Sequence, residues 1–313
     1  MSIEEERNKA IETIKSSGLK DIKKELRSDK ELVMMAVKKR GADLQYVGEE
    51  LKKDREFMLE IVKQNSIALY YAGEEAKNDR EIVLEAVKQS SDIILDYVGE
   101  EAKNDGEIVL ESIKKNYRAL KYAGEEAKND REIVMKALKQ NIEALEYAGK
   151  EVLNDRKFML EAVKENGWAL KYAGEEAKND REIVLEAVKE NCYALRYAGE
   201  KLKNDKEIVL EAIKNSDYED YDLLEYAGEE IRKDKEFILE TEKERERMKA
   251  IETIRYGRLE NIKEELKNDK ELVMMAVKKR VEDLKYAGEE AKNDREIVLD
   301  VYHPVPASYE KCS

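Results

Sequence analysis

Paired glutamates are the residues of this 313-residue chain whose type and spacing most resemble those of catalytic residues. Glu74-Glu75, Glu125-Glu126 and Glu175-Glu176 are examples of a pair that recurs along most of the sequence. Two neighbouring carboxyl groups can perform acid–base chemistry when burial raises the pKa of one of them. A pair that is copied many times and flanked by lysine instead indicates a solvated face, because active sites are local exceptions in a sequence. We therefore predict no catalytic residues from these pairs.

Other reactive residue types are scarce. Cys192, Cys312 and the single histidine, His303, are too few for a disulfide framework or a Cys/His zinc site, and we expect Cys192 to be a buried structural residue. The chain also lacks the motifs of calcium loops, phosphate-binding loops and helical zinc proteases. We expect a protein that is not an enzyme and that needs no cofactor and no metal.

The charge balance argues against several classes of partner. Lys and Arg total 59 and Asp and Glu total 73, which gives a net charge of −14. An acidic chain is poorly suited to bind nucleic acid or an anionic membrane directly, since both require a basic face. No stretch is apolar enough for a membrane span, and the N-terminus is acidic where a secretory signal is basic. We expect a cytoplasmic protein, or one in the host cytosol if it is a secreted effector.

A repeat of 25 residues organises almost the whole chain. Each copy begins with an aspartate, followed by a helical apolar pattern and then by Tyr-Ala-Gly or Tyr-Val-Gly, and both prolines lie beyond residue 303. Helix-forming composition and this regular spacing predict an all-α fold, an α-solenoid of tandem 25-residue helical hairpin repeats. The marking aspartates are Asp29, Asp54, Asp79, Asp105, Asp130, Asp155, Asp180, Asp205, Asp234, Asp269 and Asp294.

Within a repeat we expect two packed helices. In the copy that starts at Asp180, the aspartate caps a first helix that stops near Asn191, and residues 194–199 form a short second helix. The glycine of Tyr-Ala-Gly allows two interpretations: a C-cap with positive φ, which we favour, or a close helix–helix approach that excludes a side chain. The tyrosine before it is expected to anchor the core.

The array restarts near its C-terminal end. Residues 9–50 and 249–290 align without a gap, and 29 of the 42 positions are identical. We therefore predict an N-terminal helical cap at 1–28, a repeat array at 29–240, a duplicated cap with restarted repeats at 241–300, and a non-repeat tail at 301–313. Pro304 should end the final helix by about His303, and we expect the tail to be disordered, with a linear recognition motif as the alternative.

The repeated motif is similar to that of a known family. Asn-Asp-Arg-Glu-Ile-Val-Leu-Glu-Ala-Val-Lys, followed by Ala-Leu-x-Tyr-Ala-Gly-Glu-Glu, resembles the short helical repeats of the DUF4116 family over about residues 29–240 and 269–300. Such repeats occur in bacterial proteins, including some secreted effectors, and in some protists and viruses. The family has no assigned activity, so the resemblance implies a helical array and leaves the function open.

Positions that vary between otherwise similar repeats are the best candidates for a binding site. Counting the aspartate as the first position, the thirteenth, fourteenth and seventeenth positions change freely and should line one edge of the solenoid, which we call the variable edge. Aromatic residues and arginine are enriched at binding hot spots, although relaxed drift at exposed sites explains variation equally well. The candidate partner-binding residues are Tyr70, Tyr117, Arg118, Trp168, Tyr193 and Arg196.

Two hypotheses for the function follow. The first is a non-catalytic scaffold that binds another protein, of unknown identity, along the variable edge. The alternative is an acidic inhibitor that mimics nucleic acid in the basic groove of an enzyme; we place it second because Lys77, Lys103 and Lys128 alternate with the glutamate pairs. The insertion at residues 216–222 is either a further contact site or a solvated bulge.

Overall fold

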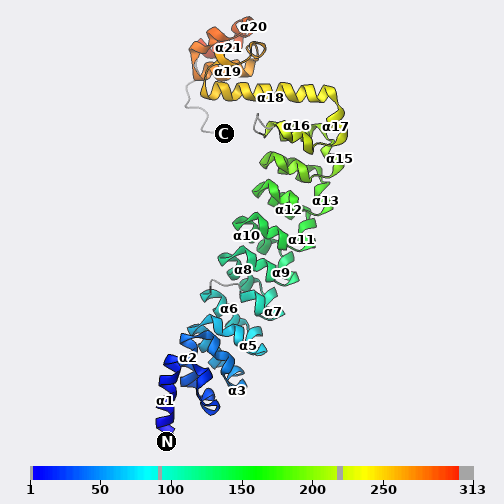
Figure 1. The fold of residues 1–313 in the computed structure, drawn as a ribbon. Coiled ribbons are helices and arrows are strands. Elements are labelled where there is room, and N and C mark those ends of the chain that lie inside the picture. Colours follow the sequence, from blue (N-terminus) through cyan, green and yellow to red (C-terminus); the bar gives the residue numbers. More distant parts are fainter. Residues whose placement is uncertain (1–2, 91–93, 217–220, 303–313) are drawn as a thin grey trace. The chain divides into compact units, whose positions relative to one another are not determined.

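The computed structural model describes residues 3–90, 94–216 and 221–302. Every described element is helical and none of these residues forms a strand, which confirms the all-α prediction (Figure 1). The chain divides into two compact units, residues 1–183 and residues 184–313, which are described separately below.

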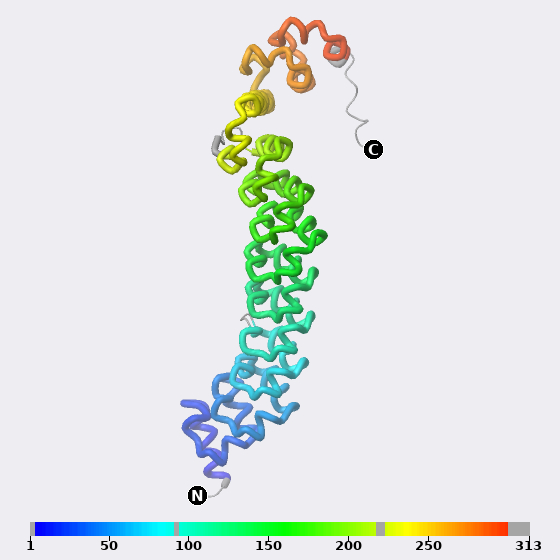
Figure 2. Tube along the Cα trace, turned by 90° about the vertical axis from the view of Figure 1, so that its right-hand side faces the viewer, coloured from blue at the N-terminus to red at the C-terminus, as the bar shows by residue number. Residues whose placement is uncertain are grey.

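Each repeat consists of three helical segments in place of the predicted two. A ten-residue α-helix is followed by a 3₁₀ helix and then by an α-helix of four or five residues, where the sequence suggested only a bridge. Within the first unit, Figure 2 shows each repeat as one turn of a coil that stacks on the turn before it. The repeat solenoid is therefore confirmed, with a more finely divided repeat than a helical hairpin.

The first unit contains the N-terminal helix and most of the array. Its long helices are α1 (Ile3–Ser16), α2 (Lys30–Lys39), α4 (Arg55–Gln64), α6 (Arg80–Gln89), α8 (Gly106–Lys115), α10 (Arg131–Gln140), α12 (Arg156–Glu165) and the start of α14 (Arg181–Glu190). Its short α-helices are α3 (Glu49–Lys52), α5 (Glu74–Asn78), α7 (Glu100–Asn104), α9 (Glu125–Asn129), α11 (Lys150–Asn154) and α13 (Glu175–Lys178). Its 3₁₀ helices are η1 (Leu19–Asp21), η2 (Lys24–Ser28), η3 (Gly41–Tyr46), η4 (Ser66–Tyr71), η5 (Ile94–Tyr97), η6 (Tyr117–Tyr122), η7 (Ile142–Tyr147) and η8 (Gly167–Lys171).

The second unit repeats the same pattern around one longer helix. Its α-helices after α14 are α15 (Glu200–Lys203), α16 (Lys206–Lys214), α17 (Glu229–Lys233), α18 (Lys235–Tyr256), α19 (Lys270–Lys279), α20 (Glu289–Lys292) and α21 (Arg295–Tyr302). Its 3₁₀ helices are η9 (Cys192–Tyr197), η10 (Tyr221–Tyr226), η11 (Leu259–Asn261), η12 (Glu264–Leu266) and η13 (Val281–Tyr286). Helix α18 runs through the predicted boundary at 240/241 without a break.

Capping side chains divide each repeat into its segments. In the repeat that begins at Asp105, the carboxylate accepts hydrogen bonds from the backbone N–H groups of Glu107 and Ile108, both at 3.1 Å, which starts α8. Asn116 ends that helix, because its backbone is extended at φ −157° and ψ 116°, and its side chain accepts from the N–H of Arg118 at 2.9 Å to start η6. The same side-chain cap at Asn191 agrees with the predicted stop of the first helix.

The core of each unit lies between the three segments of its repeats. Ile108, Val109 and Ile113 from α8, Leu120 from η6 and Ala127 from α9 are all at most 2% exposed. The tyrosines of the Tyr-Ala-Gly elements are half-buried, and Tyr286 packs against the core of the second unit, so the predicted contact with the core is made from its rim and not from its interior. Their rings cover the rim of the core and stay partly accessible.

The recurrent glycines do not have the positive φ that we favoured. Gly124 has φ −72° and stands at the start of α9, and the corresponding glycines share this conformation. A methyl group built on Gly124 would overlap the side chain of Asn104 in the preceding repeat. The favoured C-cap interpretation is therefore wrong, and the alternative of a close approach is correct, with an asparagine side chain as the neighbour.

The ends of the described segments bear on the remaining predictions. Helix α21 is described as far as Tyr302, and His303 and Pro304, where we predicted that the final helix stops, lie outside the described residues. The predicted disordered tail at 301–313 begins two residues too early, because Val301 and Tyr302 belong to α21. The rest of that tail, residues 303–313, and residues 217–220 of the insertion lie outside the described residues. Among the described helices, none combines the length and the apolar character that crossing a membrane requires.

Candidate functional site

An amide latch joins several pairs of successive repeats. The N–H of Gly124 donates to the carbonyl of Lys103 at 2.8 Å, and the Oδ1 of Asn104 accepts from the N–H of Glu126 at 3.1 Å. The asparagine of one repeat thus caps the short helix of the following repeat, which leaves no room for a side chain on Gly124. The same contacts join Asn129 to Gly149, so the backbone that carries the 3₁₀ helices is held in a fixed register.

A charge ladder links the starts of the long helices. Arg55 donates from Nε to Asp79 at 2.7 Å and from its terminal nitrogen to Glu81 at 2.6 Å, while Asp79 also caps its own helix. Burial tends to raise the pKa of Asp79, but the Arg55 ion pair and the backbone N–H donors outweigh it and lower the pKa below its ordinary value. The corresponding contacts of the first unit join Arg7 to Asp29, Lys30 to Asp54, Arg80 to Asp105, Arg131 to Asp155 and Arg156 to Asp180.

The ladder is interrupted at one step. Gly106 occupies the position where the neighbouring repeats carry arginine. The start of α8 therefore has no side chain that could form the ladder ion pairs with Asp130 and Glu132 at the start of α10. Glu132 forms no ion pair within the described residues. Helices α8 and α10 are still packed side by side, and a side chain at position 106 would begin in ordinary contact with Ile133, at 4.0 Å from its Cδ1.

On the first unit, the variable edge follows the 3₁₀ helices, and Tyr70 is its most exposed aromatic residue. Tyr70 is 54% exposed and its neighbour Ile67 is 51% exposed, both on η4. The Tyr70 ring makes edge contacts with Tyr71 at 4.8 Å and with Tyr97 of the next repeat at 5.1 Å between centroids. These rings form an accessible aromatic cluster that spans two repeats.

Tyr117 and Arg118 lie together two repeats further along. The hydroxyl of Tyr117 donates to the carboxylate of Glu143 in the next repeat at 2.6 Å, which raises the pKa of Tyr117. The guanidinium of Arg118 lies 4.9 Å from the centre of the Tyr117 ring and 3.9 Å from Glu143. This pair is therefore held by a neighbouring repeat, whereas among the described residues Tyr70 makes ring contacts and no side-chain hydrogen bond.

Trp168 and the residues of the second unit complete the predicted set. Trp168 is 36% exposed on η8, and its N–H donates to the cap Asn166 at 3.0 Å. In the second unit, Tyr193 and Arg196 share one partner: the Tyr226 ring lies 6.5 Å from the Tyr193 ring and 5.7 Å from the Arg196 guanidinium. The structure thus places the candidates on η4, η6 and η8 of the first unit and on η9 of the second, and it brings together Tyr117 with Arg118, and Tyr193 with Arg196.

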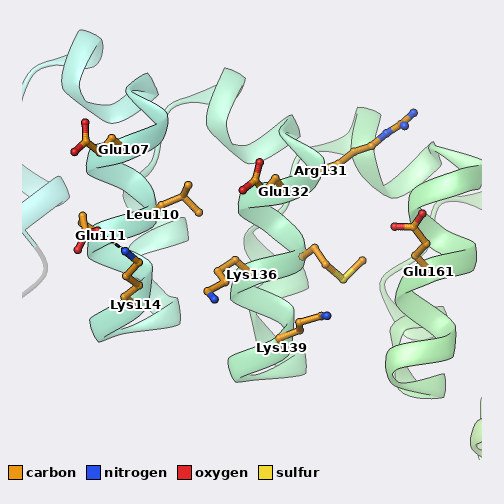
Figure 3. A pocket seen from close by; sticks show the side chains of 10 residues that line it. Glu107, Leu110, Glu111, Lys114, Arg131, Glu132, Lys136, Lys139 and Glu161 are labelled. Atoms are coloured by element: carbon orange, nitrogen blue, oxygen red, sulfur yellow. Dashed lines mark hydrogen bonds and ion pairs between the residues drawn. The ribbon is translucent and has the colours of Figure 1, made fainter.

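A groove on the long helices was missed by the sequence analysis. It has a volume of about 850 Å³ and runs across α8, α10 and α12 (Figure 3). Leu110 and Met135 contribute apolar surface, Glu132 lies near the start of α10, and Lys114, Lys136 and Lys139 lie toward the helix ends. Two departures from the repeat, Gly106 and Lys136, are visible in the sequence and mark this place.

The geometry offers little for catalysis. The first glutamate of most pairs forms an ion pair with the lysine three residues later, as between Glu125 and Lys128 at 3.2 Å, and Glu125 is 81% exposed. Within the described ranges, no group of three or more histidine, cysteine, aspartate or glutamate residues is arranged to hold a metal ion. Cys192 is buried at 6% exposure, in agreement with the sequence analysis.

Comparison with known proteins points to one family. The family described as "Domain of unknown function (DUF4116)" matches most of the chain in overlapping segments, beginning at residue 9 and so including part of the predicted N-terminal cap. The matched residues are 9–52, 29–75, 54–101, 105–153, 143–178, 155–202, 180–219, 205–243 and 248–290. No curated protein and no solved structure matches the chain.

Proposed function

Because the chain belongs to the DUF4116 family, whose function is unknown, and is built of tandem helical repeats, we propose that it is a non-catalytic scaffold that binds another protein along the variable edge. Each repeat adds one 3₁₀ helix to this edge, so the surface lengthens with the number of repeats. A protein is a better partner for it than nucleic acid or membrane, since the chain has a net charge of −14.

The observation that carries this proposal is the exposure of large apolar side chains on the variable edge. Ile67, Tyr70 and Trp168 are 51%, 54% and 36% exposed, whereas the neighbouring alanine and leucine residues of the same 3₁₀ helices are buried. Exposed aromatic residues favour protein–protein contact, because they bury much area and lose little conformational entropy on binding.

The rigid backbone beneath the edge supports the same proposal. The amide latch and the side-chain caps fix the 3₁₀ helices before any partner arrives, so binding does not need to order them. A preorganised surface loses less free energy to ordering than a flexible one.

Nucleic-acid mimicry receives less support from the geometry. A mimic needs a row of free carboxylates, but Glu74, Glu100 and Glu125 each pair with a lysine of the same short helix. The repeated Lys–Glu pairs reduce the negative potential at the spacing where a mimic would need it.

The proposal is tested by photo-crosslinking in cytosol from the source cell or its host. A benzophenone side chain at position 70 or at position 168 should capture the same protein, whereas the same group at Glu101, an exposed residue of the short helix α7, should not. The purified partner should then bind the Tyr70→Ala, Trp168→Ala double variant at least tenfold more weakly. Unchanged affinity of the double variant would contradict the proposal.

A further inference from the structure

The groove across α8, α10 and α12 differs chemically from the rest of the first unit. The seventh position of the repeat holds glutamate on the neighbouring long helices, as at Glu85, Glu111 and Glu161, but α10 has Lys136 there. Lys136 forms no ion pair within the described residues, whereas Lys114 is paired with Glu111 and Lys139 with Glu165. Lys136 is thus a cation without an ion-pair partner among the described residues of an acidic chain.

Glu132, one helical turn before Lys136, is an anion that likewise forms no ion pair among the described residues. Glu132 lacks its ladder arginine because residue 106 is glycine, and Figure 3 shows Glu132 and Lys136 both on the side of α10 that faces α8. Leu110 points into the same space from α8. The groove therefore presents a carboxylate on one rim, an ammonium group on the other, and apolar surface between them.

This arrangement matches an amphipathic helix that lies across the long helices. Neighbouring packed helices are about 8–10 Å apart, and seven residues of an α-helix span about 10.5 Å, so apolar side chains seven residues apart fall at successive gaps between long helices. The two flanks of such a helix would face the two rims, and each rim selects the opposite charge.

We propose that the groove between α8, α10 and α12 binds an amphipathic helix of a partner protein, with an acidic flank on Lys136 and Lys139 and a basic residue on Glu132. Only residues of the long helices line this groove, so the site is separate from the variable edge and does not depend on the function proposed for that edge. The ladder break at Gly106 leaves Glu132 available to a basic residue of the partner, and the glutamate-to-lysine change at position 136 provides the selectivity for an acidic flank.

Two substitutions that restore the ordinary repeat test this site without endangering the fold. Lys136→Glu installs the residue that neighbouring repeats carry, and Gly106→Arg restores the ladder cation that would occupy Glu132. Lys63→Glu on α4 is the matched control, because it makes the same change in net charge on another exposed helix surface.

The probe is a labelled synthetic helix with leucine at positions 1, 4, 8 and 11, glutamate along one flank and lysine along the other. Binding is measured by fluorescence anisotropy with the full chain. We expect Lys136→Glu to weaken binding about tenfold and Gly106→Arg at least threefold, while Lys63→Glu stays within twofold of the unmodified protein. A second peptide with lysine on both flanks should gain affinity on Lys136→Glu, beyond any gain on Lys63→Glu.

Three results would overturn the proposal. One is equal weakening by Lys136→Glu and Lys63→Glu, which would indicate a general charge effect. Another is the absence of binding of the first peptide up to 1 mM. The third is size-exclusion chromatography that shows a dimer of the unmodified protein and a monomer of Lys136→Glu, because the occupant would then be a second copy of this chain.

Discussion

Residues 9–50 and 249–290 are two copies of one sequence element, and they keep some of the same polar contacts in different surroundings. In the first copy, the buried Asp43 accepts from the N–H of Leu19 at 3.3 Å; in the second, Asp283 accepts from the N–H of Leu259 at 3.2 Å. The start of the following long helix is also paired in the same way, Arg7 with Asp29 and Arg247 with Asp269. These two contacts depend on residues within or just before the element and occur in both copies.

The copies differ where another repeat covers one of them. Gly41 is buried, because Asn65, Ile67 and Ala68 of the next repeat lie where its side chain would be. The corresponding residue of the second copy, Val281, is 53% exposed. The residue at the thirteenth position is thus constrained by the following repeat rather than by its own helix, which explains why this position varies along the chain.

Exchanging these two residues should give the largest effect. Gly41→Val forces a branched side chain against the backbone nitrogen of Ala68, and we expect a loss of about 2–3 kcal/mol in local stability, since overpacking that involves backbone cannot relax cheaply. Val281→Gly should change stability by less than about 1 kcal/mol. Hydrogen exchange measured on peptides from both copies in the same molecule gives the comparison directly, and unchanged exchange of η3 and η4 in Gly41→Val would refute it.

Replacing the buried aspartates, Asp43 and Asp283, should give the second largest change in stability. Asp43→Ala removes the acceptor of both the Leu19 N–H and the Nε of Arg40, which donates at 3.3 Å, so we expect a loss of about 2 kcal/mol. Asp283→Ala should cost less, because Asp283 Oδ1 and Arg280 Nε are buried and lack hydrogen-bond partners among the described residues. Hydrogen exchange of η1 and η11 distinguishes the two variants, and an equal loss in both copies would show that the better-bonded aspartate brings no additional stability.

Sequence analysis correctly predicted the features that each repeat determines by itself, and it missed the features that depend on contacts with the neighbouring repeat. The aspartate register was enough for the all-α solenoid, because N-caps and apolar periodicity act within a few residues. The conformation of the glycines was predicted wrongly, since the reason for glycine at position 124 is the side chain of Asn104 in another repeat.

The two candidate sites also differ in whether sequence alone could predict them. The exposure of Tyr70 and Trp168 on the variable edge could be predicted from their variable positions. The groove could not, because it needs α8, α10 and α12 to lie side by side before the changes at Gly106 and Lys136 face one space.

The amide latch allows a smaller comparison between the copies. A methyl group on Gly288 would overlap Asn268, which caps α20 through the N–H of Ala291, whereas a methyl group on Gly48 meets only the hydroxyl of Ser28 at 3.0 Å. We expect Gly288→Ala to cost about 1 kcal/mol, and Gly48→Ala to be neutral or slightly stabilising, because alanine reduces the entropy of the unfolded chain. The measurement is thermal unfolding of the two variants beside the unmodified protein; a larger loss in Gly48→Ala would contradict the latch.

The smallest expected effect is the response of the two ladder contacts to acid. Burial tends to raise the pKa of Asp29 and of Asp269, but the backbone N–H groups of Leu32 and Leu272, together with Arg7 and Arg247, lower both values below the ordinary one. A carboxyl group whose pKa is lower in the folded state contributes stability at pH values above its unfolded pKa, near 3.9, and loses it as the pH falls through the folded value. Both copies should therefore lose protection from hydrogen exchange at the starts of α2 and α19 below about pH 4, after correction for the intrinsic exchange rate.

Asp29→Asn and Asp269→Asn test this origin of the pH dependence. Each variant keeps a capping oxygen that does not titrate, so each should flatten the pH dependence in its own copy and leave the other copy unchanged. If Asp29→Asn left the acid response at α2 intact, some other carboxylate would have to cause it, and the ladder contact would not be the origin of the pH dependence.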